Sequence, residues 1–129
     1  MQELMMLVVD DEEDVCERLR SILSRKFNCT VEMACNGQGA LEKIKHRKFD
    51  LVILDIKMPG LSGIDVLKEG VKVSPETKFL AMSGYDSHEV ANEALRAGAV
   101  DFISKPQTPE SIELKVRQIL GPADEYPQR

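Results

Sequence analysis

The chain is predicted to fold as an α/β domain, in which a five-stranded parallel sheet is covered by helices on both faces. Two observations support this fold class. Short apolar runs alternate along the chain with longer segments in which apolar residues recur every three or four positions. This strand-helix order repeats five times, and such alternation is typical of parallel sheets whose strands are joined by crossover helices.

The predicted strands fall into two groups. Three runs are almost continuously apolar, as expected for central strands covered on both faces: Leu4–Val9, 51–54 and 79–82. Two others, 31–34 and 100–103, partly alternate between apolar and polar residues. That alternation predicts half-exposed strands at the edges of the sheet.

The predicted helices are marked by apolar periodicity and by their end signals. The apolar positions are, in order, Val15, Leu19, Ile22 and Leu23; Leu41 and Ile44; Ile64, Leu67 and Val71; Val90, Ala94 and Leu95; and Ile112, Val116, Ile119 and Leu120. Ser87 is a candidate N-cap of the fourth helix, and Gly98 is its candidate C-cap. Thr108 followed by Pro109 predicts the start of the fifth helix, and Gly121 predicts its end.

The length of 129 residues fits one domain. We expect this domain to span residues 1–121, with residues 122–129 as a polar tail or the start of a linker. The formal net charge of −5 argues against a direct nucleic-acid surface. We therefore interpret the basic cluster within 43–48 as the solvated face and last turn of a helix.

Neither a secretion signal nor a membrane span is predicted. The first residues lack a basic stretch followed by a long apolar one, and no segment approaches about 18 consecutive apolar residues. The three cysteines, Cys16, Cys29 and Cys35, form no CxxC pattern, so we interpret them as small core residues with reduced thiols. These features predict a cytoplasmic protein without a membrane partner.

Polar side chains stand at the carboxyl ends of four predicted strands, and all strands of a parallel sheet end at one edge. Asp10 and Asp11 follow the first strand, Asp55 the third, Ser83 the fourth and Lys105 the fifth. Because Asp55 lies where a buried strand breaks into a turn, we expect it to stand half out of the core. The sequence thus predicts three carboxylates, one hydroxyl and one ammonium at one rim.

These groups suit phosphoryl transfer. Three clustered carboxylates repel one another, and a hard divalent cation bound through oxygen ligands, most commonly Mg2+, would relieve that cost. Lys105 would neutralise charge on a phosphoryl oxygen, and the Ser83 hydroxyl would hydrogen-bond another. Asp55 would be the nucleophile, attacking phosphorus in line to give an acyl phosphate.

Each residue taken alone has a simpler explanation. An Asp after a strand is often only a turn or N-cap residue, the acidic run 10–14 can complement a helix dipole, and a single lysine is usually solvated. A functional site is favoured because the groups occur together at four strand ends.

In this order along the chain, the residues resemble the receiver domain of two-component response regulators, of the chemotaxis-regulator type. The resemblance covers residues 4–120. It rests on the apolar strand into Asp10-Asp11, on Asp55-Ile56-Lys57-Met58-Pro59-Gly60 with Gly63, on Ser83 before Gly84-Tyr85, and on Lys105-Pro106. It implies a flavodoxin-like, doubly wound fold with strand order 2-1-3-4-5 and five helices.

The resemblance also implies roles for the site residues. Asp55 would accept a phosphoryl group from a sensor histidine kinase or a phosphotransfer protein, and Lys105 would contact that group. Asp10, Asp11 and Asp55 would bind Mg2+, together with the backbone carbonyl of Lys57. The domain would catalyse only its own phosphorylation and dephosphorylation, and so would act as a signalling switch and not as an enzyme.

A switching mechanism is implied as well. Ser83 would move toward the phosphoryl oxygens, and Phe102 of the fifth strand would follow it inward; many family members have Tyr there, whose hydroxyl Phe lacks. The surface expected to change comprises the fourth helix, fifth strand and fifth helix, within 87–120, and would contact an output domain or protein, or a second copy of the chain. Its expected exposed members are Asn92, Arg96, Glu113 and Arg117.

Two further residues flank the predicted site. Lys57 and Tyr85 lie two positions beyond Asp55 and Ser83 respectively. We expect the Lys57 ammonium or the Tyr85 ring to hinder the water that attacks the acyl phosphate, and so to set the lifetime of the phosphorylated state.

Three other functions fit parts of the pattern. A phosphohydrolase with an aspartate nucleophile would use the same groups, but many such enzymes have a second Asp where this chain has Lys57. A nucleotide-binding module would need more than Gly37-Gln38-Gly39, which lacks the GxGxxG and GKS/T loops and better fits a helix start. A receiver-like domain that is never phosphorylated is disfavoured by the complete set of acidic, hydroxyl and lysine residues.

Overall fold

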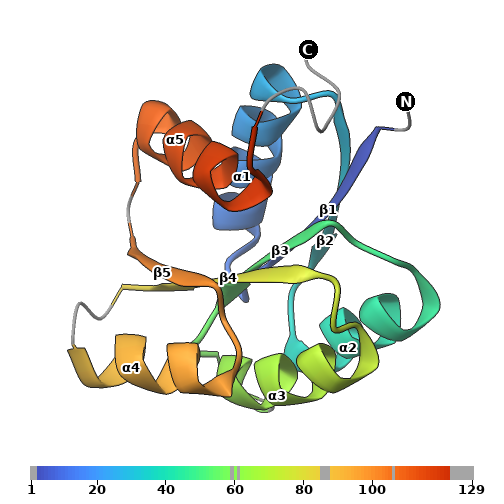
Figure 1. Ribbon diagram of the computed structural model, residues 1–129, viewed down its shortest axis with the longest axis vertical. Coiled ribbons are helices and arrows are strands. Elements are labelled where there is room, and N and C mark those ends of the chain that lie inside the picture. The colour runs from blue at the N-terminus through green and yellow to red at the C-terminus, as the bar shows by residue number, and fades with distance from the viewer. Residues whose placement is uncertain (1–2, 59, 61, 85–87, 106, 123–129) are drawn as a thin grey trace.

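The structure is a computed structural model, and it describes residues 3–58, 60, 62–84, 88–105 and 107–122. Strands and helices alternate through these residues in the predicted order (Figure 1). The strands are β1 (Leu4–Val9), β2 (Cys29–Ala34), β3 (Leu51–Asp55), β4 (Lys78–Ser83) and β5 (Asp101–Ser104). The helices are α1 (Glu13–Lys26), α2 (Gly37–His46), α3 (Gly63–Val73), α4 (His88–Ala97) and α5 (Pro109–Leu120).

The strands form one parallel sheet in the order β2-β1-β3-β4-β5, which confirms the predicted fold class and strand order. Because every neighbouring pair is parallel, all five strands end at the same edge. Asp55 is in register with Met82, and Ser83 with Ser104, so the ends of β3, β4 and β5 are aligned. The edge strands are β2 and β5, as their alternating patterns predicted.

Helices cover both faces of the sheet. Figure 1 shows α1 and α5 on one face and α2, α3 and α4 on the other. Each face has its own apolar core: the first includes Leu19, Leu23, Ile112 and Val116, and the second includes Ile44, Leu67 and Ala94. Burial of each large aliphatic side chain contributes about 1.5–3 kcal/mol, so the sheet is a well-anchored platform for the loops at its edge.

Local signals place several helix ends where the sequence predicts them. Thr108 is the N-cap of α5, and its side chain accepts a hydrogen bond from the Ser111 N–H, with Pro109 as the first helical residue. Gly98 and Gly121 follow α4 and α5 with φ angles of 118° and 89°, a region that favours glycine. Ser87, the predicted N-cap of α4, lies outside the described residues.

The glycine-rich segment after β2 forms the start of α2, which confirms the prediction of a helix start at this position. The Asn36 side chain caps this helix by accepting a hydrogen bond from the Gly39 N–H at 2.7 Å. Basic residues lie in the last turn of α2, as predicted. Among the described helices, none has the length and apolar character needed to cross a membrane. The predicted tail falls mostly on 123–129, outside the described part.

The cysteines do not all belong to the core. Cys16 is buried and Cys29 is half-buried, but Cys35 is exposed. Our interpretation of all three as core residues is therefore wrong for Cys35, because it lies one residue beyond the end of β2 and outside the sheet.

Candidate functional site

Three carboxylates meet at the carboxyl edge of the sheet. Asp10 and Asp11 directly follow β1, and Asp55 is the last residue of β3. Each offers an oxygen, and these oxygens all lie within 4.8 Å of one another. Asp11 is exposed, but Asp10 and Asp55 are only 0% and 3% exposed. The expectation that Asp55 stands half out of the core is therefore wrong, because Asp55 is still paired with Met82 of β4 in the sheet.

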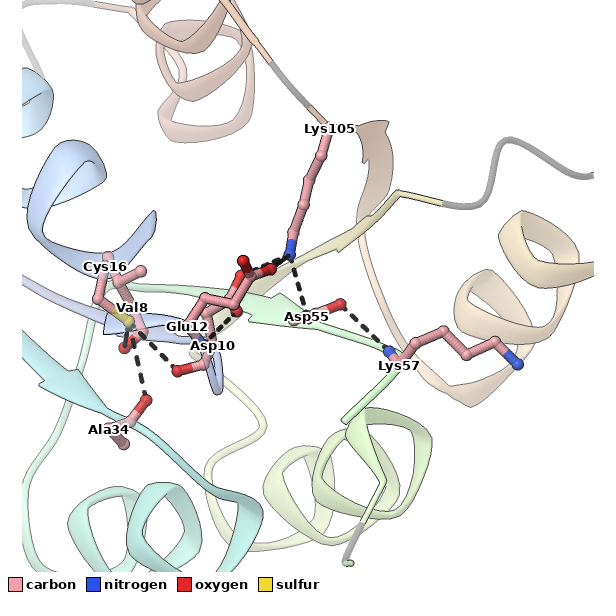
Figure 2. Close-up of polar contacts among 8 residues, drawn as sticks. All are labelled: Val8, Asp10, Glu12, Cys16, Ala34, Asp55, Lys57 and Lys105. Atoms are coloured by element: carbon pink, nitrogen blue, oxygen red, sulfur yellow. Dashed lines mark hydrogen bonds and ion pairs between the residues drawn. The ribbon is translucent and has the colours of Figure 1, made fainter. Parts of the chain in front are cut away.

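Lys105 reaches this cluster from the end of β5 (Figure 2). Its ammonium lies 2.7 Å from Asp10 Oδ2, 3.2 Å from Asp55 Oδ2 and 3.8 Å from Glu12 Oε1. The Lys105 backbone N–H donates to the Ser83 carbonyl oxygen at 2.9 Å, which fixes the base of the side chain beside the end of β4. A single cation is thus shared among carboxylates from two strand ends and the loop after β1.

Glu12 is a site residue that the sequence reasoning missed. Its backbone N–H donates to Asp10 Oδ1 at 2.9 Å, and its carboxylate faces Lys105. The acidic run after β1 therefore has two roles. Asp10 accepts a backbone hydrogen bond just before α1, and it also belongs to the carboxylate cluster. The signal that could have found Glu12 is its position directly after the acidic pair.

Burial and crowding of charge shift the pKa values of the site. Burial is the largest cause that raises the pKa of Asp55 above its ordinary value; Lys105 opposes this shift and Asp10 adds to it. Burial lowers the pKa of Lys105, but the hydrogen bond to Asp10 and the charges of Asp55 and Asp10 outweigh burial, so this pKa is raised. Lys105 therefore remains a cation, while Asp55 lies in surroundings that would favour additional positive charge.

The donor set fits a hard divalent cation. Asp10 Oδ2 is buried and pairs with the Lys105 ammonium, which it shares with Asp55. A buried carboxylate oxygen with one shared cation is only partly compensated for its lost hydration. Divalent cations such as Mg2+ prefer carboxylate and carbonyl oxygens, and bridging several carboxylates would offset their repulsion.

Lys57 connects the site with α4. Its backbone N–H donates to Asp55 Oδ1 at 3.2 Å, whereas its side chain extends away from Asp55 (Figure 2). That side chain lines a hollow of about 530 Å³ together with Glu89, Glu93 and Arg96 of α4. An ammonium turned toward α4 is poorly placed to hinder water at Asp55.

The predicted switch residues occupy two different positions. Ser83 ends β4 and is fully buried, one residue beyond the register partner of Asp55. Phe102 lies within β5, half-buried, and packs against the core on the face that α4 covers. The structure therefore brings Ser83 to the strand-end edge but does not bring Phe102 into the carboxylate cluster. Tyr85 lies outside the described residues.

The expected output surface needs one correction. Asn92 and Arg96 are exposed, but Glu113 and Arg117 are only partly accessible. The Arg117 guanidinium lies 4.6 Å from the centre of the Phe27 ring, pairs with Glu113 at 2.9 Å and donates to a backbone carbonyl at the end of α1. The prediction that these two residues are exposed is wrong, because they tether α5 to α1.

Comparison with known proteins agrees with this geometry. The family model of the response regulator receiver domain matches residues 6–117. The transcriptional regulatory protein ZraR of Klebsiella oxytoca is 38% identical over 93% of the chain, which spans only 27% of the length of that protein. The chemotaxis protein CheY of Thermotoga maritima is 38% identical over 82% of the chain and 88% of its own length.

Solved structures show the same fold. A CheY-like receiver domain protein from Methanospirillum hungatei JF-1 has a TM-score of 0.88 at 31% identity, with 96% of both chains covered. A response regulator from Burkholderia pseudomallei, solved with a phosphorylated aspartic acid, a calcium ion and citrate, has a TM-score of 0.83 at 28% identity, covering 95% of this chain and 70% of that one. Receiver domains bind Mg2+ through acidic residues, and such a cluster is present here. The chain therefore belongs to the receiver domain family of response regulators, the phosphoacceptor signalling domains of two-component systems.

Proposed function

We propose that Asp55 is the phosphoacceptor of this receiver domain and takes a phosphoryl group from a sensor histidine kinase or a phosphotransfer protein. The observation that carries this assignment is the position of Asp55, at the end of β3, beside Lys105 and with the Asp10–Asp11 pair within 4.8 Å. The phosphorylated aspartic acid of the Burkholderia pseudomallei relative supports it. In the transfer, an Asp55 oxygen attacks phosphorus in line while the donor group leaves.

The neighbouring residues would bind Mg2+ and neutralise the charge of the phosphoryl group. We assign Asp10, Asp11 and Asp55 as Mg2+ ligands, with the backbone carbonyl of Lys57 as a further one. When bound, Mg2+ would neutralise these carboxylates and the phosphoryl oxygens. Lys105 is already anchored at its backbone beside β4, so only its side chain has to turn from the carboxylates toward a phosphoryl oxygen. These residues would promote only the phosphorylation and dephosphorylation of Asp55 itself.

The output would follow from the charge that Asp55 gains. A phosphoryl group adds about two negative charges and new acceptor oxygens, and the Ser83 hydroxyl would turn toward them. Phe102 shares its core with Val90 and Ala94 of α4, so a movement of its ring reaches that helix. The α4-β5-α5 surface would then bind an output domain or protein, or a second copy of the chain. Within it, α4 and β5 would change most, because Arg117 tethers α5 to α1.

We also propose boundaries and a location for the domain. The receiver domain would comprise residues 1–121, with 122–129 as a tail or the beginning of a linker to an output domain. A histidine kinase or phosphotransfer partner places the phosphodonor in the cytoplasm, and a cytoplasmic location of this domain is consistent with that partner.

Incubation with acetyl phosphate and Mg2+ tests the assignment. We expect intact-mass measurement to show one added phosphoryl group, a gain of about 80 Da, in the wild type and in Asp14→Asn, an exposed acidic control on α1. Asp55→Asn should show none. An equal adduct in Asp55→Asn, or no adduct in the wild type, would overturn the assignment.

A further inference from the structure

We propose that Cys16 and Cys35 form a redox-sensitive thiol pair, which a hydroperoxide converts to an intramolecular disulfide beside the acidic site. The two thiols line one cavity of about 280 Å³, together with Glu13, Met33 and Ala34. Cys16 belongs to α1 and Cys35 directly follows β2. The fold therefore places side by side two cysteines that are far apart in sequence.

The distances are compatible with a bond between the two residues. Cys16 Sγ lies 3.9 Å from the carbonyl oxygen of Ala34, a contact that Figure 2 shows. Because the same peptide unit leads to Cys35, standard backbone dimensions place its Cα within about 7 Å of the Cys16 sulfur. A disulfide requires the two Cα atoms to lie about 4.4–6.8 Å apart, so the loop after β2 would shift toward α1 as the bond forms.

The cavity that Cys16 and Cys35 share lies on the side of the sheet covered by α1. Ala34 belongs to the core on the face covered by α2, whereas Met33 packs against the core on the face covered by α1. Cys35 lines the cavity together with Met33 and Cys16, so it lies on the side of the sheet that α1 covers. Cys16 belongs to the core of that face too.

The two thiols differ in access, and this difference sets the order of the chemistry. Cys35 is exposed and meets the oxidant first, whereas Cys16 is 2% exposed. The Cys35 thiolate attacks one peroxide oxygen, so an S–O bond forms, the O–O bond breaks and the other oxygen leaves, protonated, as water or an alcohol. The Cys16 sulfur then attacks the sulfenic sulfur, so the S–S bond forms and the hydroxyl leaves with the Cys16 proton as water. Two thiols are oxidised and one peroxide is reduced.

The disulfide would also affect the acidic site. The Cys16 thiol contacts the carbonyl oxygen of Asp10 at 3.5 Å, a weak hydrogen bond that a disulfide cannot make. The bond would also tie the beginning of α1 to the end of β2. Loss of groups that support a metal ligand typically weakens binding 10–100-fold, so we expect Mg2+ to bind about tenfold more weakly after oxidation. This consequence rests on the proposed Mg2+ site, whereas the disulfide itself does not.

Peptide mapping tests the bond. The full chain is treated with hydrogen peroxide without denaturant, free thiols are blocked with N-ethylmaleimide, and the peptides are identified by mass. We expect Cys16 linked to Cys35 and Cys29 alkylated, the same link in Cys29→Ser, and no link in Cys35→Ser. Alkylated Cys16 in oxidised wild type, or Cys35 linked only between two chains, would overturn the proposal.

Calorimetric titration with Mg2+ tests the coupling. We compare reduced and oxidised wild type, with peroxide-treated Cys35→Ser as the control for other oxidation. Weaker binding only in the oxidised wild type supports the coupling, and equal affinity in the two wild-type forms refutes it. Failure of both forms to bind Mg2+ would count against the proposed metal site and the coupling with it, while leaving the mapped disulfide in place.

Discussion

The Lys105 ammonium lies 2.7 Å from Oδ2 of Asp10, and that carboxylate is fully buried. Desolvation of a charge is tolerable only when a partner of opposite charge is close, so Lys105 is the counter-ion of this buried carboxylate. In the phosphorylated state the same lysine would be needed at a phosphoryl oxygen, while a cation takes over the carboxylates. Lys105 would therefore serve as the counter-ion of the carboxylates before phosphorylation. In the phosphorylated state it would contact a phosphoryl oxygen.

Replacing Lys105 tests its role as counter-ion. We expect Lys105→Met to lower the free energy of unfolding by about 3 kcal/mol without Mg2+, because two buried carboxylates lose their cation. Lys115→Met is the matched control, since Lys115 pairs with the more exposed Asp101 and should cost less than about 1 kcal/mol. Urea unfolding of the three proteins provides the measurement. Equal losses in the two variants would contradict this interpretation.

The raised pKa of Asp55 predicts a specific pH dependence. A carboxyl group whose pKa is higher in the folded than in the unfolded state favours folding when protonated, and that contribution is lost as pH rises through the folded pKa. Without Mg2+, the wild type should therefore become less stable than Asp55→Asn as pH rises from about 4 to about 8. Asp101 and Glu113, whose pKa values are lowered, have the opposite dependence but are common to both proteins.

Unfolding of the wild type and of Asp55→Asn across that pH range gives the difference directly. The comparison isolates Asp55, because the other titrating groups contribute equally to the unfolding free energy of both proteins wherever Asn leaves them undisturbed. A difference that is constant with pH, or that shrinks as pH rises, would mean that the ionised Asp55 is not disfavoured in the metal-free fold.

Mg2+ should stabilise the protein through the acidic cluster. A ligand that binds only the folded state raises stability by about 2.7 kcal/mol at one hundred times its dissociation constant, so saturating Mg2+ should raise the Tm of the wild type. Asp11→Asn should show a smaller rise, and Asp14→Asn, which changes an exposed acid outside the cluster, should behave as the wild type. Thermal unfolding followed by circular dichroism is sufficient. An undiminished shift in Asp11→Asn would remove that residue from the metal site.

Most of the fold could be predicted because central parallel strands are covered on both faces, so apolar runs record them directly. The predicted boundaries miss the polar ends of two strands. β3 includes Asp55 and β4 includes Ser83, since both residues remain in the backbone ladder despite their polar side chains. An apolar pattern cannot register a polar residue that stays in a strand.

The composition of the site could be predicted from strand ends, but its burial and its supporting contacts could not. Topology brings Asp10, Asp55 and Lys105 together whatever lies between them in sequence. The partial burial of Arg117, by contrast, depends on the ring of Phe27 arriving from the end of α1. Sequence periodicity does not reveal a contact between two helices, and it therefore predicted Arg117 to be an exposed charged residue.

The α1–α5 tether can be tested through Arg117. We expect Arg117→Ala to lower the free energy of unfolding by about 1–2 kcal/mol, because it removes the cation stacked on Phe27 and its hydrogen bond to the Lys26 carbonyl oxygen. Arg20→Ala is the control, since Arg20 forms an i,i+3 pair with Glu17 in which both side chains are nearly half exposed, and should change stability by less than about 0.5 kcal/mol. Indistinguishable urea midpoints for the two variants would show that the tether contributes no stability.

Gly63 supports the site through a close backbone approach that leaves no room for a side chain. A Cβ at Gly63 would lie 2.2 Å from the Asp55 carbonyl oxygen and 2.5 Å from the Ile56 Cα, so the backbone itself would have to move. We expect Gly63→Ala to lower the free energy of unfolding by about 3 kcal/mol, at the upper end of overpacking costs.

Gly84→Ala is the matched control for this prediction, because an added Cβ there would meet no atom of the described residues within 4 Å. It should change stability by less than about 0.5 kcal/mol, as is usual for open positions. If Gly63→Ala unfolds at the same urea concentration as Gly84→Ala, the contact between the start of α3 and the end of β3 must yield easily. In that case Asp55 would be positioned by its neighbours in the sheet, and the loop that leads into α3 would not constrain it.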